Sequence, residues 1–428
     1  MFRFGISGIP LSCKGRTLMD AVIDVHTMGL SAIEVQFLRL NTGNRPVYEE
    51  EVGLVPTEIN ELVMEVHKNG DANRVLYDFT KPLENGDVIK YLSSTTSMAK
   101  NISEIKKISA IGQNLDISIS MHAPYYLSFN ESPELEKRSM DVLKWTLIIA
   151  THLKAGCVIA EMGIANNDKE VDKIFEVIES IDKWIKHMKL PVLLGIGTSS
   201  KKELFGSIDD IVTASKKYST IFPVLNFAHL YGRDPDAIKT TGSILDILDK
   251  TEKVSKGQSY ISFSGVEVKD GNIRMTPIKR SDFKIDGLME ALIRFGHDAT
   301  IISTSPLLEH DAIYMKLTYE KMMTKYILKR QAISEKETNN VKPPEKKHIE
   351  KGKKTKEIEK GKKTKEIEKG KKTKEIEKGK KTKEIEKGKK TKEIEKGKKT
   401  KEIEKGKKTK EIEKDTGNIN KKSKQKRR

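Results

Sequence analysis

Apolar and polar positions alternate along the first 330 residues in short strand-like segments separated by longer helix-like segments. The clearest strand lies in residues 115–130 (LDISISMHAPYYLSFN), where apolar residues from Leu115 to Met121 alternate with polar residues that end at His122. A period of two predicts a strand with two different faces, and Pro124 stops it from continuing. With helices on its apolar face, this strand directs polar side chains into a barrel. His122 then lies at the C-terminal end, where barrel enzymes hold their catalytic groups.

The pattern of the whole chain predicts eight strands, each followed by a helix. The predicted strands are residues 3–6, 32–37, 115–122, 157–161, 192–196, 222–226, 260–263 and 300–303. Amphipathic segments predict helices at residues 17–28, 135–153, 171–188, 208–218, 243–254, 284–295 and 311–331, and one more after residue 98. Eight strand and helix pairs predict an α/β fold, a closed (β/α)8 TIM barrel formed by residues 1–334.

Residues 38–98 interrupt this alternation, because they lie between the second strand and its helix. Residues 62–66 and 74–77 have the pattern of a hairpin around the turn dipeptide Asn69-Gly70, and residues 87–91 predict a third strand. A loop in this position leaves the barrel on its C-terminal face. The small β-rich insertion is therefore either a lid or binding flap, or a decoration of the fold without a role in function.

The formal net charge of +18 belongs to the end of the chain rather than to the predicted barrel. The nine-residue unit KGKKTKEIE occurs seven times from Lys351 to Glu413 and contributes +14, and the stretch from Lys414 to Arg428 adds +6. The preceding 350 residues therefore carry −2. One Ile in nine residues forms no helical stripe, and the Gly in each unit costs a helix about 1 kcal/mol. Residues 335–428 are predicted to be a disordered basic tail.

A Lys-rich tail of this kind has two interpretations. The segment from Lys351 to Arg428 is either an electrostatic arm that binds DNA or RNA, or a solvated extension without function. In the first case its affinity falls steeply as the salt concentration rises. Arg39, Arg45 and Lys81, in or near the insertion, are further candidates for contacts with phosphate.

The cysteine content and the absence of long apolar segments predict the compartment. Cys13 and Cys157 lie far apart and match no metal-binding or redox spacing, so we expect a reducing, cytoplasmic environment. No stretch approaches the roughly 20 apolar residues that a membrane-spanning helix needs. The first residues, MFRFGISGIP, lack the charged and apolar regions of a signal peptide. A soluble protein without a membrane partner is predicted.

Four polar residues at or near predicted strand ends are the candidates for chemistry at the mouth of the barrel: His122, Glu161, Asn226 and His229. Zinc and manganese sites favour imidazole and carboxylate ligands. The four side chains could together hold one divalent metal ion, zinc or manganese. The alternative is a polar mouth in which they make ordinary hydrogen bonds and no metal is bound. The pattern assigns no catalytic acid, base or nucleophile.

Seven sequence blocks carry a resemblance to a known family: GIPLSCKGRT, AIEVQFLR, SMHAPYYLSFN, GTSSKKELFGS, NFAHLYGR, FSGVE and IISTSPLLEHDAIYMK. From Phe4 to Lys316 the chain resembles the endonuclease IV family, in its archaeal form, among the xylose-isomerase-like barrels. The resemblance implies a TIM barrel that acts in DNA repair as an AP endonuclease. It also implies three zinc ions that activate water to hydrolyse the phosphodiester bond on the 5′ side of an abasic site.

Carried over position by position, most of the metal ligands that the resemblance implies are replaced. His122 and His229 match two His ligands, whereas Glu161 stands in place of a His and Asn226 in place of an Asp. At four more ligand positions the chain has a residue without charge: Gly197, Ser262, Met275 and Thr304. Three divalent ions would lack donors and charge compensation, so a three-zinc cluster is not predicted.

Two functional hypotheses of different classes follow. In the first, the chain is a non-catalytic relative of the AP endonucleases that binds nucleic acid through the barrel mouth and the basic tail. In the second, it is an enzyme with one metal ion held by His122, His229 and Glu161, either an abasic-site phosphodiesterase or a sugar isomerase or epimerase. A third possibility is a barrel that recognises another protein. The preserved blocks around replaced ligands favour the first hypothesis.

Overall fold

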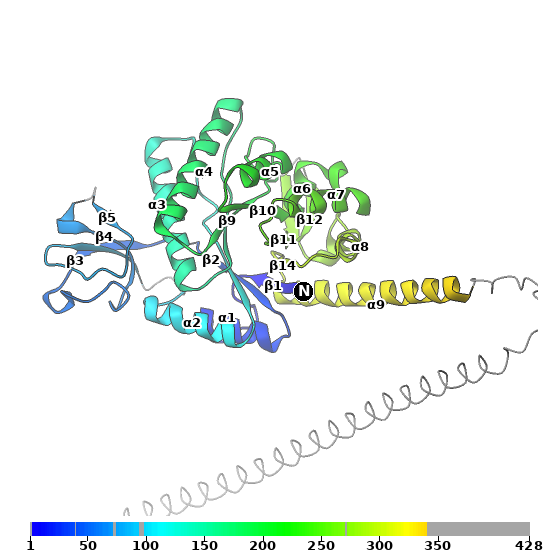
Figure 1. The fold of residues 1–428 in the computed structure, drawn as a ribbon, viewed down its shortest axis with the longest axis horizontal. Helices are drawn as coiled ribbons and strands as arrows, with labels where there is room; N and C mark the ends of the chain where they lie inside the picture. Colours follow the sequence, from blue (N-terminus) through cyan, green and yellow to red (C-terminus); the bar gives the residue numbers. More distant parts are fainter. Residues whose placement is uncertain (1, 39, 72–73, 94–97, 270–271, 340–428) are drawn as a thin grey trace, which may run out of the picture. The chain divides into compact units, whose positions relative to one another are not determined.

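The eight predicted strands form a closed parallel barrel in the computed structural model of the chain, which describes residues 2–38, 40–71, 74–93, 98–269 and 272–339 (Figure 1). These residues belong to one compact unit, Met1–Asn340. The strands follow the order β1-β14-β11-β10-β9-β8-β7-β2 around the barrel. Arg39 and the tail from Lys351 to Arg428 lie outside the described residues, so the expectations for them stay predictions.

Each barrel strand lies where the alternating pattern placed it. The strands are β1 (Arg3–Ser7), β2 (Ala32–Gln36), β7 (Ser118–His122), β8 (Cys157–Ala160), β9 (Leu193–Gly197), β10 (Ile221–Asn226), β11 (Tyr260–Phe263) and β14 (Thr300–Ser303). Most predicted strand boundaries agree within one residue, and the largest error is at the third strand, which begins at Ser118 rather than Leu115. Leu115 ends the preceding helix, and Asp116 has a left-handed backbone with φ of 54°, which a strand does not continue through.

Helices cover the outside of the barrel. They are α1 (Leu18–Thr27), α2 (Ile102–Asn114), α3 (Pro133–His152), α4 (Asp168–Met188), α5 (Ile208–Lys217), α6 (Phe227–Arg233), α7 (Thr241–Glu252), α8 (Ile285–Phe295) and α9 (Glu309–Asn339). Thr17, Ser132 and Ser207 cap helices α1, α3 and α5, because each side chain accepts a hydrogen bond from a backbone N–H of the first turn. Helix α6 was not predicted, and α9 continues past the expected end at residue 331.

The main hydrophobic core lies between the strands and the helices, and a smaller cluster fills the interior of the barrel. The interior cluster contains Ala32, Cys157, Ile159, Phe222, Val224, Tyr260 and Ile302. Phe222 fits because β9 has a glycine beside it: a Cβ atom at Gly195 would lie 2.7 Å from the Phe222 ring. Since side chains fill the interior, groups that act on a ligand have to lie at the mouth.

The insertion folds into a four-stranded antiparallel sheet with the order β3-β6-β4-β5, here called the insertion sheet. Its strands are β3 (Thr42–Pro46), β4 (Leu62–His67), β5 (Val75–Leu76) and β6 (Val88–Leu92). The predicted hairpin of β4 and β5 and the third strand β6 are confirmed. Strand β3 was missed because its sequence, TGNRP, lacks the apolar alternation of a strand and depends on pairing with β6.

The insertion sheet is attached to the outer helices α3 and α4, beside which it lies in Figure 1. Trp145 of α3 donates its indole N–H to Glu65 of β4 at 2.9 Å. The ring of Tyr77 packs edge-on against Trp184 of α4, with centroids 5.4 Å apart. These contacts favour a fixed attachment over the lid or flap that the sequence left open.

Glu65 is the centre of this attachment. Its carboxylate is buried and accepts hydrogen bonds from Lys90 at 2.7 Å, Trp145 at 2.9 Å and Tyr77 at 3.2 Å, and it lies 3.0 Å from His67 Nε2. Burial alone would raise the pKa of Glu65, but these hydrogen bonds and the charge of Lys90 hold the pKa below its usual value. Lys90, Tyr77 and His67 belong to the insertion, so Glu65 links the insertion sheet to the outside of the barrel through Trp145.

His152, at the end of α3, forms a second contact with the insertion. Its ring stacks on Phe79, with centroids 5.8 Å apart and planes inclined by 6°. Burial, and then the positive charge of Lys106, lower the pKa of His152 to about 4. An unfolded chain binds a proton here below about pH 6.5, whereas the folded chain does so only near pH 4, so stability falls as pH decreases across this window.

We therefore expect His152→Phe to reduce the loss of stability on acidification. The difference at pH 5 is on the order of 2 kcal/mol at most, because pH 5 lies about 1.5 below the pKa of a histidine in the unfolded chain. The free energy of unfolding in urea at pH 7 and pH 5 measures it. His187→Phe, at an exposed histidine of α4, is the matched control. Equal losses in the His152→Phe protein and the unsubstituted protein would contradict the prediction.

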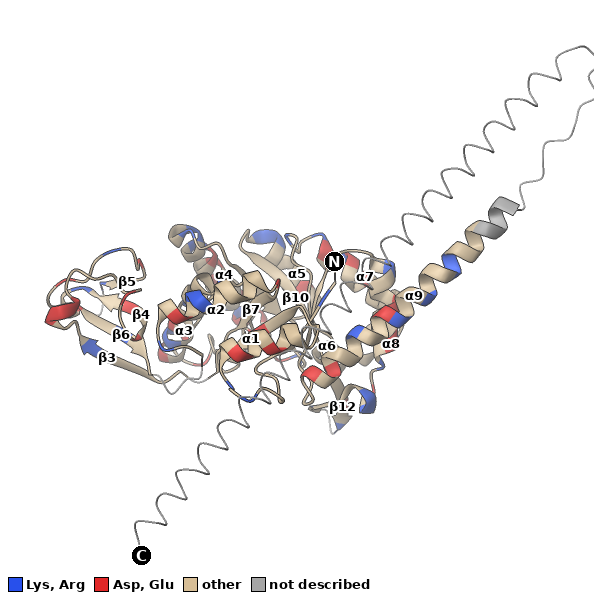
Figure 2. Cartoon of the chain, turned by 90° about the horizontal axis from the view of Figure 1, so that it is seen from below, with Lys and Arg blue, Asp and Glu red and all other residues tan. Residues whose placement is uncertain are grey.

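Basic and acidic residues are interspersed along the helices of the described part (Figure 2), as expected from the charge of −2 for residues 1–350. In that part of the chain, none of the helices combines the length and the apolar composition needed to cross a membrane.

Candidate functional site

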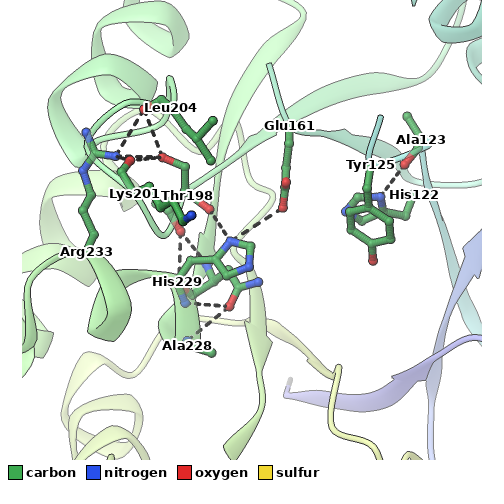
Figure 3. A network of polar contacts seen from close by, with 12 residues as sticks. His122, Ala123, Tyr125, Glu161, Thr198, Lys201, Leu204, Ala228, His229 and Arg233 are labelled. Carbon is green, nitrogen blue, oxygen red and sulfur yellow. Dashed lines mark hydrogen bonds and ion pairs between the residues drawn. The ribbon is translucent and has the colours of Figure 1, made fainter. Parts of the chain in front are cut away.

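Glu161 and His229 approach each other at the mouth of the barrel (Figure 3). Glu161 directly follows β8, and His229 lies in the first turn of α6. His229 Nδ1 is 2.8 Å from the carbonyl oxygen of Thr198 and 3.6 Å from Glu161 Oε1. Because a carbonyl oxygen only accepts, Nδ1 donates to Thr198, which leaves Nε2 as the acceptor of the neutral imidazole. The pair combines a carboxylate with an oriented imidazole.

Asn226 has a different role from the predicted one. Its side-chain oxygen accepts hydrogen bonds from the backbone N–H groups of Ala228 and His229, at 3.1 and 3.2 Å. Asn226 therefore caps helix α6 and fixes the backbone of His229. The expectation that Asn226 would be a metal ligand is not supported, because its oxygen already accepts two hydrogen bonds.

His122 lies with Tyr125, apart from the Glu161–His229 pair (Figure 3). His122 Nδ1 donates to the carbonyl oxygen of Ala123 at 2.6 Å, and the two ring centroids of His122 and Tyr125 are 4.3 Å apart. Among the described residues, no three His, Cys, Asp or Glu side chains are grouped as a metal site requires. The structure thus brings together two of the three expected metal ligands and leaves the third beside a tyrosine.

The residues present do not fit the three-zinc centre that the family resemblance implies. Gly197 ends β9 without a side chain, and Ser262 and Thr304 offer only hydroxyl groups at the ends of β11 and β14. The hydroxyl of Thr304 is buried and has no hydrogen-bond partner within the described residues. Uncharged donors cannot compensate the charge of several divalent ions, so these residues do not form a three-zinc centre.

A buried polar network around Glu34 was missed by the sequence analysis. Glu34 of β2 is fully buried, and its two carboxylate oxygens accept hydrogen bonds from Ser7 of β1 and from Tyr260 of β11, the latter at 2.8 Å. The single proton of Tyr260 goes to Glu34, so Ser120 donates to Tyr260, at 2.6 Å. Burial, and then the charge of Glu34, raise the pKa of Tyr260 well above its ordinary value.

Gln36 extends this hydrogen-bond network to the mouth of the barrel. Its amide nitrogen donates to Ser7 at 2.6 Å and to the hydroxyl of Tyr125 at 3.1 Å. The signal was present in the sequence AIEVQF, where Glu34 and Gln36 occupy the same face of a strand whose other face is apolar. Applying the period-two argument to this strand, as to the third one, would have placed both side chains inside the barrel.

The rim of the mouth exposes apolar side chains at four neighbouring strand ends. They follow β14, β1, β2 and β7, which are adjacent in the barrel. Each exposes 39–52% of its surface: Leu307, Leu11, Leu38, Tyr125 and Tyr126. Glu309 holds the loop that carries Leu11, because its carboxylate accepts hydrogen bonds from the backbone N–H groups of Leu11 and Ser12. An exposed apolar rim around a polar mouth is typical of a binding surface.

Tyr126 has a cationic neighbour. It borders a pocket of about 300 Å³ together with Arg138 of α3, and the charge of Arg138 partly offsets the effect of burial, which raises the pKa of Tyr126. Arg233 donates to Ser199 at 2.8 Å and to the carbonyl oxygens of Lys201 and Leu204, so it holds the loop after β9, which is two strands away from β7 around the barrel (Figure 3).

The structure overturns the expected phosphate contact of Arg45. All five of its N–H groups are engaged: they donate to both oxygens of Glu51, both oxygens of Glu61 and the carbonyl oxygen of Pro46. Its side chain is only 10% exposed. Arg45 therefore stabilises the insertion sheet and has no donor left for phosphate. Lys81 is exposed and lies 3.9 Å from Asp78.

Comparisons with known proteins find similar structures but assign no family to this chain. No family model matches it. An uncharacterized protein of Methanocaldococcus jannaschii is 29% identical over 226 residues, which are 51% of this chain and 81% of that protein. Similar solved structures include a D-tagatose 3-epimerase-like protein, with a TM-score of 0.49 and 13% identity over 76% of this chain and 100% of that chain.

Endonuclease IV from Thermus thermophilus is another similar structure, with a TM-score of 0.48 and 13% identity over 76% of this chain and 99% of that chain. A xylose isomerase domain protein from Alicyclobacillus acidocaldarius has a TM-score of 0.44 and 12% identity, covering 75% of this chain and 98% of that chain. Substrate and activity do not follow from similarities at this level.

Proposed function

We propose that this chain binds nucleic acid at the mouth of its barrel and does not use the three-zinc chemistry of the endonuclease IV family. The observation that carries the proposal is the pair of exposed tyrosines after β7. Tyr125 is 48% exposed and packs on His122, and Tyr126 is 52% exposed beside Arg138. Exposed aromatic rings next to cations are the means by which proteins bind unpaired bases and their phosphates.

Other groups at the mouth support the same function. Nε2 of His122 and of His229 has no hydrogen-bond partner among the described residues. A bound ligand would satisfy these polar groups. The basic tail from Lys351 to Arg428 adds a charge-based attraction to phosphate, so binding should weaken as the salt concentration rises.

Replacing both exposed tyrosines by alanine should weaken binding of a short single-stranded oligonucleotide by at least about tenfold. Stacking contributes about 1–3 kcal/mol per base, and the tail attraction is the same in both proteins. Fluorescence anisotropy at one fixed salt concentration measures the effect. Tyr125→Phe with Tyr126→Phe is the matched control, because it keeps both rings and removes only the hydroxyl groups. Equal affinities of the alanine and phenylalanine proteins would refute the role of the rings.

A second candidate function is an enzyme with one metal ion. The position of Glu161 beside the ring of His229 favours it, with Nε2 as the nitrogen that is free to bind an ion. A carboxylate and an imidazole are ligands of zinc or manganese, and one bound ion would supply a Lewis acid for a phosphodiesterase, or for a sugar isomerase or epimerase. Plasma mass spectrometry of protein purified without chelators should then find about one metal ion per chain, and His229→Ala should lose it. Metal that stays bound in His229→Ala would exclude this pair as its site.

A further inference from the structure

A second pocket lies away from the mouth, between the insertion and the outer helices. It has a volume of about 940 Å³. One wall comes from residues 75–81 of the insertion, and the other from the last turns of α3 and α4 together with Lys106 of α2. Because these helices run opposite to the strands, their last turns lie at the end of the barrel away from the mouth. The insertion therefore builds a site that the barrel alone would not have.

Aromatic rings form much of this pocket. Tyr77 and Phe79 come from the insertion and Trp184 from α4, and all three line the pocket. Tyr77 and Trp184 are partly exposed and are held edge-to-face, whereas Phe79 is only 6% exposed and supports His152 by stacking on it. Both contacts fix the rings before any ligand arrives, which lowers the entropic cost of binding a planar group. A planar aromatic ligand matches such walls.

Polar and cationic groups stand among these rings. Lys106 makes no ion pair within the described residues, and its charge acts on His152, which places the ammonium group near the imidazole. Lys81 lies on the opposite wall, close to Asp78. The imidazole of His152 is only partly exposed and makes no hydrogen bond to a described residue. It offers one donor and one acceptor, the pattern that the edge of a nucleobase presents.

We propose that this pocket binds a nucleotide, with the base against the partly exposed rings of Tyr77 and Trp184 and the phosphate near Lys106. The volume is in the range of small-molecule sites and accommodates a base, a sugar and a phosphate. A neutral ring compound would make no use of the charge of Lys106, and inorganic phosphate would make no use of the aromatic rings. A free nucleotide and one nucleotide unit of a nucleic-acid strand share this chemistry. The site is separate from the mouth, so its existence does not depend on the proposed function.

Trp184 supplies the readout for a test on the full chain. The protein has two tryptophans, and Trp145 is buried with its N–H bonded to Glu65, so a ligand in the pocket quenches mainly Trp184. The probes are adenosine monophosphate, adenosine, inorganic phosphate and a short oligoadenylate. We expect adenosine monophosphate to quench saturably, to bind more tightly than phosphate, and to lose this quench in Trp184→Phe.

Lys106→Ala should weaken binding of adenosine monophosphate by about tenfold and leave adenosine unaffected, because only the charged hydrogen bond is lost. Lys107→Ala is the matched control, since Lys107 is the next residue, is exposed and does not line the pocket. Tighter binding of the oligoadenylate would identify a strand as the source, and tighter binding of the mononucleotide a free nucleotide. Equal affinities in Lys106→Ala and Lys107→Ala, or quenching without saturation, would overturn the proposal. Alanine at Tyr125 and Tyr126, which do not line this pocket, should leave the quenching of Trp184 by adenosine monophosphate unchanged.

Discussion

Replacing Glu65 by alanine is expected to lower the free energy of unfolding by about 3–5 kcal/mol and to release the insertion sheet from the barrel. The substitution leaves the indole N–H of Trp145 and the ammonium group of Lys90 without their shared acceptor, and Trp145 is buried. Groups that lose a buried charged partner cannot be solvated in place. The loss is therefore larger than that of one ordinary hydrogen bond.

Hydrogen exchange separates the two expected effects of Glu65→Ala. Amides of the insertion sheet should lose protection first, while amides of the barrel strands stay protected, because Glu65 joins the sheet to α3 rather than the barrel strands to one another. Tyr77→Phe is the control: it removes one donor to Glu65 and keeps the hydrogen bond of Glu65 to Trp145, so about 1 kcal/mol should be lost. Uniform loss of protection throughout the barrel would show that the insertion is not a separate unit of stability.

Replacing Glu34 by alanine should also cost about 3–5 kcal/mol, with loss of the barrel as a whole. Glu34 joins β1, through Ser7, to β11, through Tyr260, and all three side chains are buried. Alanine leaves the hydroxyl protons of Ser7 and Tyr260 without their acceptor and opens a cavity in the interior. Cooperative unfolding in urea, followed by circular dichroism, measures the change.

Glu34→Gln is the informative comparison, because it keeps the volume and removes one acceptor. An amide oxygen accepts from one hydroxyl, whereas the amide nitrogen accepts from none, so about 1–3 kcal/mol should be lost. The ratio between the losses of unfolding free energy in Glu34→Ala and in Glu34→Gln separates the contribution of hydrogen bonding from that of packing. A loss below about 1 kcal/mol in Glu34→Ala would mean that water takes the place of the carboxylate.

The barrel could be predicted because each strand and each helix is specified by residues that are close together in the sequence. Each strand has a short apolar run or a period-two pattern, and capped helices such as α3 begin at a recognisable Ser132. The start of β7 was predicted wrongly because Asp116 adopts a left-handed backbone, although Leu115 and Ile117 on either side of it continue the apolar alternation of a strand. Strand β3 was not predicted because the sequence TGNRP does not favour a strand unless it pairs with β6.

The site was less predictable, because it depends on how the strands are staggered around the barrel. Sequence placed His122 and His229 near strand ends, but only the structure separates His122 from the Glu161–His229 pair. It also shows that Asn226 caps a helix, which its position before an unpredicted helix concealed. Glu34 could have been found by alternation alone, whereas its partner Tyr260 lies 226 residues further along the chain.

The pairing of the first strand with the last has a consequence for synthesis on the ribosome. Arg3 of β1 is in register with Thr300 of β14, so one edge of β1 stays unpaired until about 300 residues have been made. At the usual rates of translation this takes about 15–60 s, far longer than secondary structure needs to form. During that time the nascent chain presents an open strand edge, the kind of surface that chaperones shield from aggregation.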